Sequence, residues 1–557
     1  MSINVEERVL KIPIPLGGSE GHSVEEVSVQ LPPEYPDIER VIYAEGLVNL
    51  TEPTPVLGQV VLAGTVDIGL IYQGRSGDKP TLHRAEFPQA AEFSIPVELA
   101  EVTPETVLKT FVNVESVTAA LGKNRSINCS IILEYELETA HIEETNVLTS
   151  ISGVDSNVIV SSEPWGVEVF IGQAQMRKTI ESVLNLGKTD PPIGDLLRVS
   201  VKPRVVSARC LAGQALIEGE LDCELLYAPT VPVVPSVPVS SDPEELTPPE
   251  ESDDFLTSFS TPVPEPPLVV KKDIVGFSKF VLSAALATIN PEMRVEAQLY
   301  VVGLQVLATA SDKVEVAVTL NAKARIYEDL VLDVITAVDT DGEERIDLNR
   351  RILTVPENVA VVVEEVVTTG TPGIPAAKAE LKEILLVQAK PVVTQCRLVQ
   401  NKVTVAGRVP LSILYIGENE LGAEVLDFLE IEKGFEFKET IEVPGAEPGM
   451  LVKVEPAIAT VAVQILDPFT LEANILVSLS VEVADLVEKE VVMEAAVAVS
   501  APQDGASIRV VVVQHGDTLW KLARRYGTSM EFLVNYNNLG NVDSLAVGQR
   551  IRIPTML

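Results

Sequence analysis

Three thirteen-residue stretches that share one pattern constrain the fold of this chain more than any other feature. They run from Val60 to Tyr72, from Ala215 to Tyr227 and from Val403 to Tyr415. Each has glycine at its fifth position and tyrosine at its last, in the pairs Gly64 and Tyr72, Gly219 and Tyr227, and Gly407 and Tyr415. Between the two, apolar residues alternate with others, which predicts a strand with one buried face. Three matches in one register indicate an internal repeat.

The repeat predicts a mainly β fold. Val, Leu, Ile and Ala are abundant while aromatic residues make up only 4% of the chain, which suits sheets built from branched aliphatic residues. We expect three successive β-sandwich or β-barrel-like repeats followed by a small α+β module. The predicted domains are residues 1–150, 151–345, 346–500 and 508–555. We expect connectors, at about residues 139–190 and 340–378, to precede the second and third repeats.

The second repeat carries an insertion directly after its tyrosine. Residues 229–267 contain eleven prolines and eight acidic residues, with no Lys or Arg. A segment with low hydrophobicity, charge of one sign and many prolines cannot bury enough surface to offset its ordering entropy. We therefore predict a disordered loop, and a proline-rich ligand for a partner module is the alternative.

The charge of the chain narrows the class of its partners. Asp and Glu number 81 and Lys and Arg number 42, which gives a net charge of −39. This excess argues against nucleic acid and against an anionic membrane surface as partners. Two roles of the acidic excess remain open: it keeps the protein soluble through self-repulsion, or it forms an acidic docking surface. The N-terminus lacks the pattern of a secretory signal, and no apolar run is long enough for a membrane-spanning helix, so we expect a cytoplasmic protein.

The sequence shows no pattern typical of an enzyme or of a metal site. The four cysteines lie far apart without a CxxC pair, so we expect reduced thiols rather than disulfides. The four histidines are equally scattered. No nucleophile elbow, phosphate-binding glycine loop or zinc-binding spacing is present. We therefore predict a protein that is not an enzyme and has no cofactor.

The last fifty residues follow a different pattern. A strand-like run from Val510 to Gln514 precedes Asp517, which we expect to be the N-cap of a first helix. An apolar helical face of residues at i, i+3, i+4 and i+7 follows, formed by Leu519, Leu522, Ala523 and Tyr526.

Gly527 then has the position of a C′ residue. Thr528 and Glu531 predict a capping box for a second helix, whose apolar side is formed by Phe532, Leu533 and Tyr536. A final strand, Gln549 to Ile553, gives the order strand, helix, helix, strand.

This C-terminal module resembles the LysM family. The matching motifs are V-x-H-G-D-T-L-W from Val513, A-x-x-Y-G-T from Ala523, L-x-x-x-N-N-L from Leu533 and V-G-Q-x-I-x-I-P from Val547. The resemblance implies binding of N-acetylglucosamine polymers, chiefly peptidoglycan, in a groove between two loops. It places Gly516, Asp517, Thr518 and Leu519 on one side of the groove. On the other side it places Asn541, Val542, Asp543, Ser544 and Leu545.

The charge of the module differs in sign from that of the rest of the chain. Residues 508–557 contain six Lys and Arg and three Asp and Glu. A cationic module on an anionic body suggests a polyanionic wall polymer or an acidic protein as its partner. Folding of the module back on its own body is a weaker alternative. For a protein partner, Trp520, Arg524 and Arg525 are the expected anchors, because Trp and Arg are enriched in binding hot spots.

The combination of repeats and module resembles the SPOCS-domain proteins of spore formers. The residues that carry this resemblance are the glycine–tyrosine pattern and the K-P-x-V that includes Pro203 or Pro391. The similar architecture is the SipL/SpoVID class of spore-envelope morphogenetic proteins. It implies a scaffold in the mother-cell cytosol, at the forespore surface, that works with the coat-basement ATPase SpoIVA. The alternative is a peptidoglycan-binding protein of the cell surface, and the sequence leaves self-association open.

Overall fold

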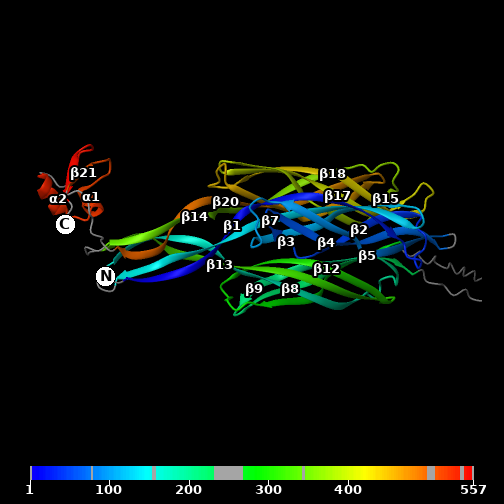
Figure 1. The fold of residues 1–557 in the computed structure, drawn as a ribbon. Coiled ribbons are helices and arrows are strands. Elements are labelled where there is room, and N and C mark those ends of the chain that lie inside the picture. The colour runs from blue at the N-terminus through cyan, green and yellow to red at the C-terminus, as the bar shows by residue number, and fades with distance from the viewer. Residues whose placement is uncertain are drawn as a thin grey trace, which may run out of the picture.

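Strands form almost all of the β-rich body, which a computed structural model shows as an elongated assembly with a narrow extension at one end (Figure 1). The structure describes residues 3–76, 79–153, 158–230, 268–340, 345–498, 508–539 and 545–554. The predicted disordered insert lies outside these residues, except for Pro229 and Thr230. Pro229 is the last residue of a strand and pairs with Ile193.

The strands fall into three consecutive sets. The first set is β1 (Ile3–Gln30), β2 (Arg40–Leu50), β3 (Thr54–Val56), β4 (Gln59–Ser76), β5 (Lys79–Glu98), β6 (Val107–Leu121) and β7 (Ser126–Gly153). The second is β8 (Val158–Asn185), β9 (Ile193–Leu211), β10 (Gln214–Pro229), β11 (Val270–Ala285), β12 (Arg294–Ala310) and β13 (Lys313–Thr340). The third is β14 (Arg345–Gly370), β15 (Glu380–Ala389), β16 (Val392–Val399), β17 (Lys402–Glu418), β18 (Glu424–Glu442), β19 (Leu451–Asp467) and β20 (Thr470–Ala498).

Each set forms two antiparallel sheets with the same topology. In one sheet the last strand of the set is central and pairs with the first strand and the next-to-last, in the orders β1-β7-β6, β12-β13-β8 and β14-β20-β19. In the other sheet the strand with the glycine–tyrosine pattern is central, namely β4, β10 or β17. A separate apolar core lies between the two sheets of each set. The prediction of three successive β-sandwich repeats is therefore confirmed.

The repeated tyrosine has the same role in all three sets. Each tyrosine is fully buried, and its hydroxyl donates a hydrogen bond to the backbone oxygen 36 residues earlier in the chain. The bonds run from Tyr72 to Pro36 (3.3 Å), from Tyr227 to Pro191 (2.8 Å) and from Tyr415 to Ala379 (3.0 Å). A buried hydroxyl needs a hydrogen-bond partner. Each bond therefore holds the residues just before the first strand of the sheet against the central strand.

The repeated glycine lies beneath an aromatic ring. The cross-strand partners are Phe93 opposite Gly64, Phe280 opposite Gly219 and Phe437 opposite Gly407. A Cβ atom at any of the three glycines would lie closer than 3.0 Å to a carbon of that ring and to a backbone oxygen of the other neighbouring strand. Glycine is therefore required by close approach from both sides.

The narrow extension, which we call the finger, is made of three two-stranded ribbons. It consists of residues 3–13 with 142–153, 158–170 with 327–340, and 345–357 with 485–498. Its core combines side chains from all three sets, including Leu10, Trp165 and Val491. The chain passes from one set to the next at the tip of the finger (Figure 1).

Most residues of the expected connectors, 139–190 and 340–378, belong to strands of the three sets. Those residues lie largely in β7, β8 and β14, where each finger ribbon buries one face against the other two. The N-terminal residues form one long strand, β1, which takes part in both the finger and the first sandwich. The alternation of Trp165, Val167 and Val169, all buried, is the signal that could have revealed the second ribbon.

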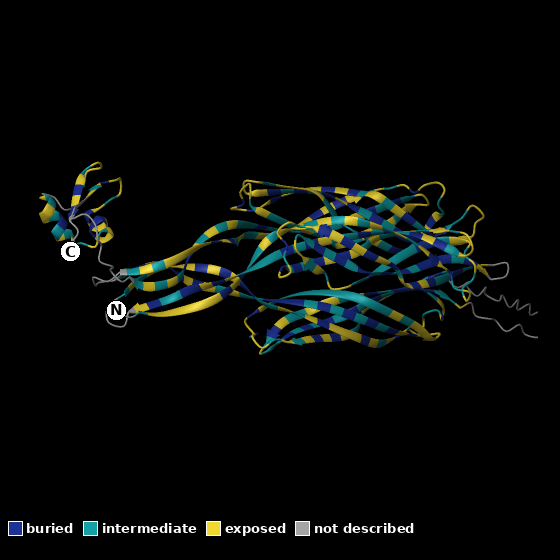
Figure 2. Cartoon of the chain, in the orientation of Figure 1, coloured by how far each residue is buried: buried dark blue, intermediate teal, exposed yellow. Residues whose placement is uncertain are grey.

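The three sets also pack against one another away from the finger. The residues that precede the three repeated tyrosines, Ile71, Leu226 and Leu414, meet in one core cluster, and Figure 2 shows buried residues throughout this broad part of the body. Equivalent positions of the repeat thus meet at the centre of the body.

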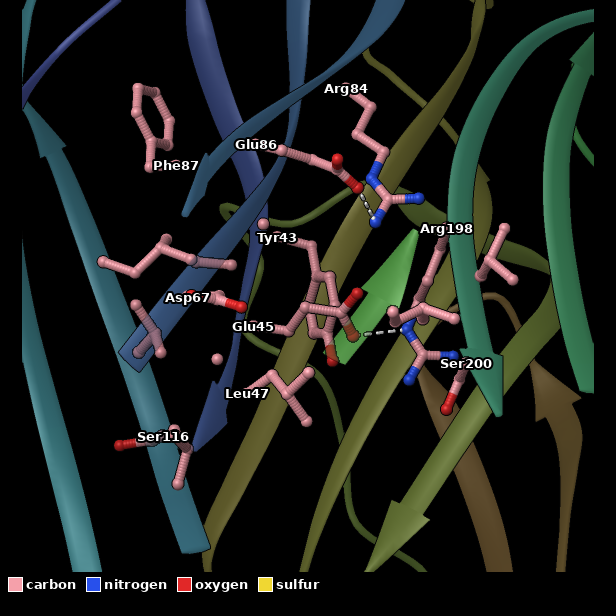
Figure 3. Close-up of a pocket in the computed structure, with 18 of the residues that line it drawn as sticks. Tyr43, Glu45, Leu47, Asp67, Arg84, Glu86, Phe87, Ser116, Arg198 and Ser200 are labelled. Carbon is pink, nitrogen blue, oxygen red and sulfur yellow. Dashed lines mark hydrogen bonds and ion pairs between the residues drawn. The ribbon is translucent and has the colours of Figure 1, made fainter. Parts of the chain in front are cut away.

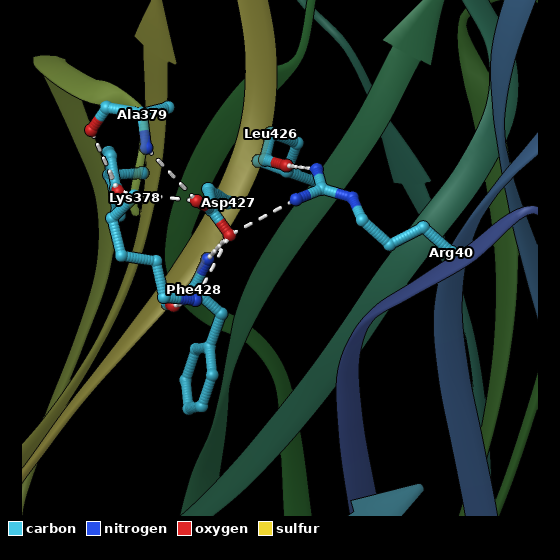
Figure 4. A network of polar contacts seen from close by, with 7 residues as sticks. Arg40, Lys378, Ala379, Leu426, Asp427 and Phe428 are labelled. Atoms are coloured by element: carbon cyan, nitrogen blue, oxygen red, sulfur yellow. Dashed lines mark hydrogen bonds and ion pairs between the residues drawn. The ribbon is translucent and has the colours of Figure 1, made fainter. Parts of the chain in front are cut away.

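A polar network joins the first set to the third (Figure 4). Asp427 of β18 forms ion pairs with Arg40 of β2 (3.4 Å) and with Lys378 (3.3 Å). Its backbone neighbours take part as well, because Arg40 donates to the oxygen of Leu426 (2.7 Å) and Lys378 donates to that of Phe428 (2.6 Å). The Asp427 side chain is buried, and burial of a charged carboxylate is costly unless it is paired. Arg40 and Lys378 provide this pairing.

The cysteines give a test of this packing. All four are free thiols; Cys129, Cys210 and Cys223 are buried, while Cys396 is exposed. Burial raises the pKa of Cys129 to about 11 and, together with the nearby Glu224 charge, that of Cys223 to about 12. At pH 8 these thiols therefore stay protonated and unreactive.

Partial burial also raises the pKa of Cys396, but its side chain is exposed to the reagent. We therefore expect one thiol of the native protein to react with a chromogenic disulfide reagent in a more rapid phase than the others, and four after denaturation. Replacing Cys396 with serine should remove the rapid phase. A rapid phase that survives in that variant would show that the cores of the sandwiches are open to solvent.

Within the described residues, no helix is long and apolar enough to cross a membrane. The same part of the chain contains no group of His, Cys, Asp and Glu side chains arranged to hold a metal ion.

Candidate functional site

The C-terminal module folds as a strand, two helices and a strand. Its elements are β21 (Ile508–Val512), α1 (Leu519–Arg525), α2 (Met530–Asn537) and β22 (Arg550–Pro554). The two strands pair in antiparallel fashion. The predicted helical face of α1 is confirmed, since Leu519, Leu522 and Ala523 are buried and Tyr526 packs against them.

Both predicted N-caps are wrong by one residue. The cap of α1 is Thr518, whose hydroxyl accepts the N–H of Lys521 (3.2 Å), and the cap of α2 is Ser529, whose hydroxyl accepts the N–H of Phe532 (3.1 Å). Asp517 instead closes the preceding turn by accepting the N–H of Gln514 (2.8 Å). Thr, Ser and Asp are all good capping residues, so only the backbone path decides which one caps.

The end of α1 follows the prediction. Gly527 has φ +63°, and the N–H of Thr528 donates to the oxygen of Ala523 (2.9 Å) while that of Gly527 donates to Arg524 (3.4 Å). This pair of bonds is a Schellman motif, in which glycine adopts the left-handed conformation without a Cβ penalty.

The first side of the predicted groove is a short loop that is held in place by hydrogen bonds. Gly516 has φ +86°, and its carbonyl accepts a hydrogen bond from the Lys521 ammonium (3.1 Å). Among the described residues, the N–H groups of Gly516 and Thr518 have no hydrogen-bond partner. The loop can therefore offer backbone donors to an acetamido group or to a protein carbonyl.

The other residues predicted for the groove either pack in the core of the module or lie outside the described residues. Leu519 is buried in the core of the module, so its side chain does not line a surface groove. Leu545 is half-buried and packs against that same core. Asn541, Val542, Asp543 and Ser544 lie outside the described residues, so the second side of the groove is represented by Leu545 alone.

The predicted protein anchors lie on the exposed side of α1. Trp520 is exposed, and the Arg524 guanidinium lies 5.2 Å from the centre of its ring, a cation–π arrangement. Arg524 also forms an ion pair with Asp339 of β13, at the tip of the finger. Arg525 is exposed. This ion pair is a contact of the module with its own body, and the sequence does not reveal the partner of Arg524 because the two residues belong to different domains.

Away from the module, the β-rich body contains a cavity of about 690 Å³. Residues of all three sets line it, among them Tyr43, Arg198 and Phe428, and Figure 3 shows charged side chains around it. Arg198 donates to Glu45 (2.6 Å) and forms a second ion pair with Glu224. Burial raises the pKa of the lining residue Glu430, with a further increase from the neighbouring Glu432 charge.

Several charged groups of the cavity are already partnered within the protein. Arg84 forms an ion pair with Glu86, and Asp67 accepts the N–H of Gln89 (2.7 Å). Of the buried polar side-chain atoms in the described chain that have no partner, none belongs to a residue that lines this cavity. Because its polar lining stabilises the contact between the sets, we assign no ligand to it.

Comparisons with known proteins identify two domains in the chain. Residues 511–554 match the family model of the LysM domain, and residues 380–466 match the model described as SipL, SPOCS domain. The second match covers β15 to β18 and most of β19, in the third set. A search of curated proteins and a search of solved structures each found no matching protein.

The two matches define the class of this protein. It is a mainly β protein that combines a sporulation-related SPOCS domain with a C-terminal LysM domain, as the sequence predicted. LysM domains bind peptidoglycan and related glycans, and neither matched domain is a catalytic one. The matches thus support a sporulation-related adaptor with a wall-binding module.

Proposed function

We propose that this protein is a non-enzymatic scaffold in the assembly of the spore coat or cortex. The observation that carries the proposal is the presence of a SPOCS domain and a LysM domain on one chain. The proposed place of action is the mother-cell cytosol at the forespore surface. The proposed partners of the LysM domain are a coat-basement protein of the SpoIVA type and peptidoglycan.

The proposal extends the SPOCS assignment to the whole body. Residues 1–150, 151–345 and 346–500 would each be one SPOCS-like repeat, although the family match lies in the third. The support is structural: the three sets share one strand order, the glycine–phenylalanine contact and the tyrosine hydrogen bond.

For the LysM domain, the proposal favours docking to a protein through α1. The exposed Trp520 and Arg525 offer a large apolar surface and a planar cation on the same short helix. The glycan mode would use the loop amides of Gly516 and Thr518 together with the residues proposed for the second side, Asn541 to Leu545. Each such glycan site is small, so many copies on one surface would be needed for firm attachment.

Two retention assays with the full-length protein separate these modes. We expect the double substitution Trp520→Ala and Arg525→Ala to reduce capture by immobilised coat-basement protein about tenfold or more, because both anchors of a hot spot are lost. Retention on insoluble peptidoglycan should change little in the same variant. The matched control is Arg397→Ala, an exposed arginine of the β-rich body.

The opposite pattern, with glycan retention lost and partner capture intact, would contradict docking through α1. The location of a fluorescent fusion tests the broader proposal. A ring around the forespore supports it, whereas staining of the vegetative cell wall would favour the alternative of a cell-surface protein.

A further inference from the structure

The LysM module has a second exposed face, formed by its two strands. Val511 and Val513 point toward the helices, together with Ile551 and Ile553. Their neighbours therefore point outward and form what we call the Val/Arg face, which consists of Val510, Val512, Val547, Arg550 and Arg552. The register pairs Val510 with Arg552 and Val512 with Arg550.

This face has no partner within the described part of the chain. Its three valines are 51 to 68% exposed, and Arg550 and Arg552 are exposed without an acidic side chain in ion-pair distance there. Outward valines on a short two-stranded sheet are unusual for a surface that stays in water, so the face fits an interaction.

The β-rich body also has a face that combines exposed valines with a charged residue. It lies on β14, an edge strand of its sheet. Val361, Val363 and Val367 are 61 to 65% exposed, and Glu365 lies on the same side of the strand between them. We call these residues the Val/Glu face. β14 has one proline, Pro356, on its finger side, as β1 and β8 do at Pro13 and Pro164; residues 357–370, which include the Val/Glu face, contain none.

We propose that the Val/Arg face of one molecule docks on the Val/Glu face of a second copy of this chain. Both faces repeat valines at spacings of two residues along a strand, and their charges are opposite. The charge of the two parts favours the same pairing, because residues 508–557 have three more basic than acidic residues while the whole chain has a net charge of −39.

The length of the chain requires that the two faces belong to different molecules. β20 ends at Ala498, which pairs with Arg345 at the tip of the finger, and β21 begins at Ile508. The intervening residues span at most about 36 Å when fully extended. Val363 lies 18 residues along β14 from Arg345, which is about 60 Å at 3.3 Å per residue. The strand from Ile508 to Val512 adds about 13 Å at 3.3 Å per residue, so the total reach of about 49 Å still falls short of Val363 on the β14 of the same chain.

Such a contact joins two different surfaces, so a pair of molecules still has one free Val/Arg face and one free Val/Glu face. Contacts of this type build open assemblies unless their geometry closes a ring. Each contact is small, and we therefore expect weak association that strengthens when many molecules lie on one surface. Docking through α1 would remain available, because the helices and the Val/Arg face lie on opposite sides of the module's core.

Sedimentation velocity of the full-length protein over a range of concentrations tests the proposal. We expect the mean mass to rise with concentration at low ionic strength and to fall as salt is added, since salt screens exposed charges. Both Glu365→Lys and the pair Arg550→Glu with Arg552→Glu should weaken association about tenfold or more, because like charges would then face each other. An equimolar mixture of the two variants should associate again.

Matched controls make the same charge changes elsewhere. Glu488→Lys alters an exposed acid of the finger, and Arg397→Glu with Lys433→Glu alters two exposed bases of the β-rich body; both should associate as the unaltered protein does. A protein that stays monomeric at every concentration would overturn the proposal. Equal loss in the control variants, or a mixture that fails to associate, would do the same. None of these outcomes depends on coat-protein or glycan binding.

Discussion

Replacing Arg198 with alanine is expected to destabilise the β-rich body by about 3–5 kcal/mol, the cost of leaving a buried charge without its partner. The Arg198 side chain is only 5% exposed and lies between the carboxylates of Glu45 and Glu224. Glu45 belongs to the first set of strands and Arg198 to the second, so the substitution weakens the contact between two sandwiches as well as one ion pair. The midpoint of urea unfolding, followed by circular dichroism, measures the effect.

Arg204 provides a matched control, because it also lies on β9 and also has two acidic partners, Glu220 and Asp222. Its side chain is 49% exposed, so we expect Arg204→Ala to change the midpoint far less. Adding Glu45→Gln to Arg198→Ala should recover part of the loss, since it removes one unpaired carboxylate. Equal effects of Arg198→Ala and Arg204→Ala would show that the centre of the body is open to water.

The second large effect is expected at the repeated glycine. Gly407→Ala should cost about 2–3 kcal/mol, toward the upper end for an overpacked site, because the new methyl group would meet both the Phe437 ring and the backbone oxygen of Val392. The ring can rotate away, but the carbonyl is held in the sheet by the pairing of β16 with β17. Thermal unfolding measures the loss.

Gly303 of β12 is the control for this substitution. A Cβ atom there would make ordinary contact with Thr319 at 3.5 Å, so alanine should be tolerated or slightly stabilising. Adding Phe437→Ala to Gly407→Ala should not restore stability, because the clash with the carbonyl remains and a cavity is added. A double variant as stable as the unaltered protein would show that the ring alone requires glycine at this position.

Much of the module was predictable because its signals are local. The helical spacing of Leu519, Leu522 and Ala523 and the position of Gly527 depend on residues less than ten apart. The choice of Thr518 rather than Asp517 as the cap was not predictable, since both side chains suit a cap and only the backbone path distinguishes them. The Val/Arg face was recognisable in principle from the alternation of Val510 and Val512, but its lack of a covering element was not.

By itself, the sequence determined that the chain contains three β repeats and a LysM domain, because glycine, tyrosine and apolar alternation recur at fixed spacings. Only the tertiary structure decided how the repeats are joined. The finger pairs strands that are more than one hundred residues apart, as Leu10 with Thr145, and Arg198 reaches Glu45 across 153 residues. Such pairings leave no local pattern, because the partner of a strand or a buried charge is chosen by packing in three dimensions.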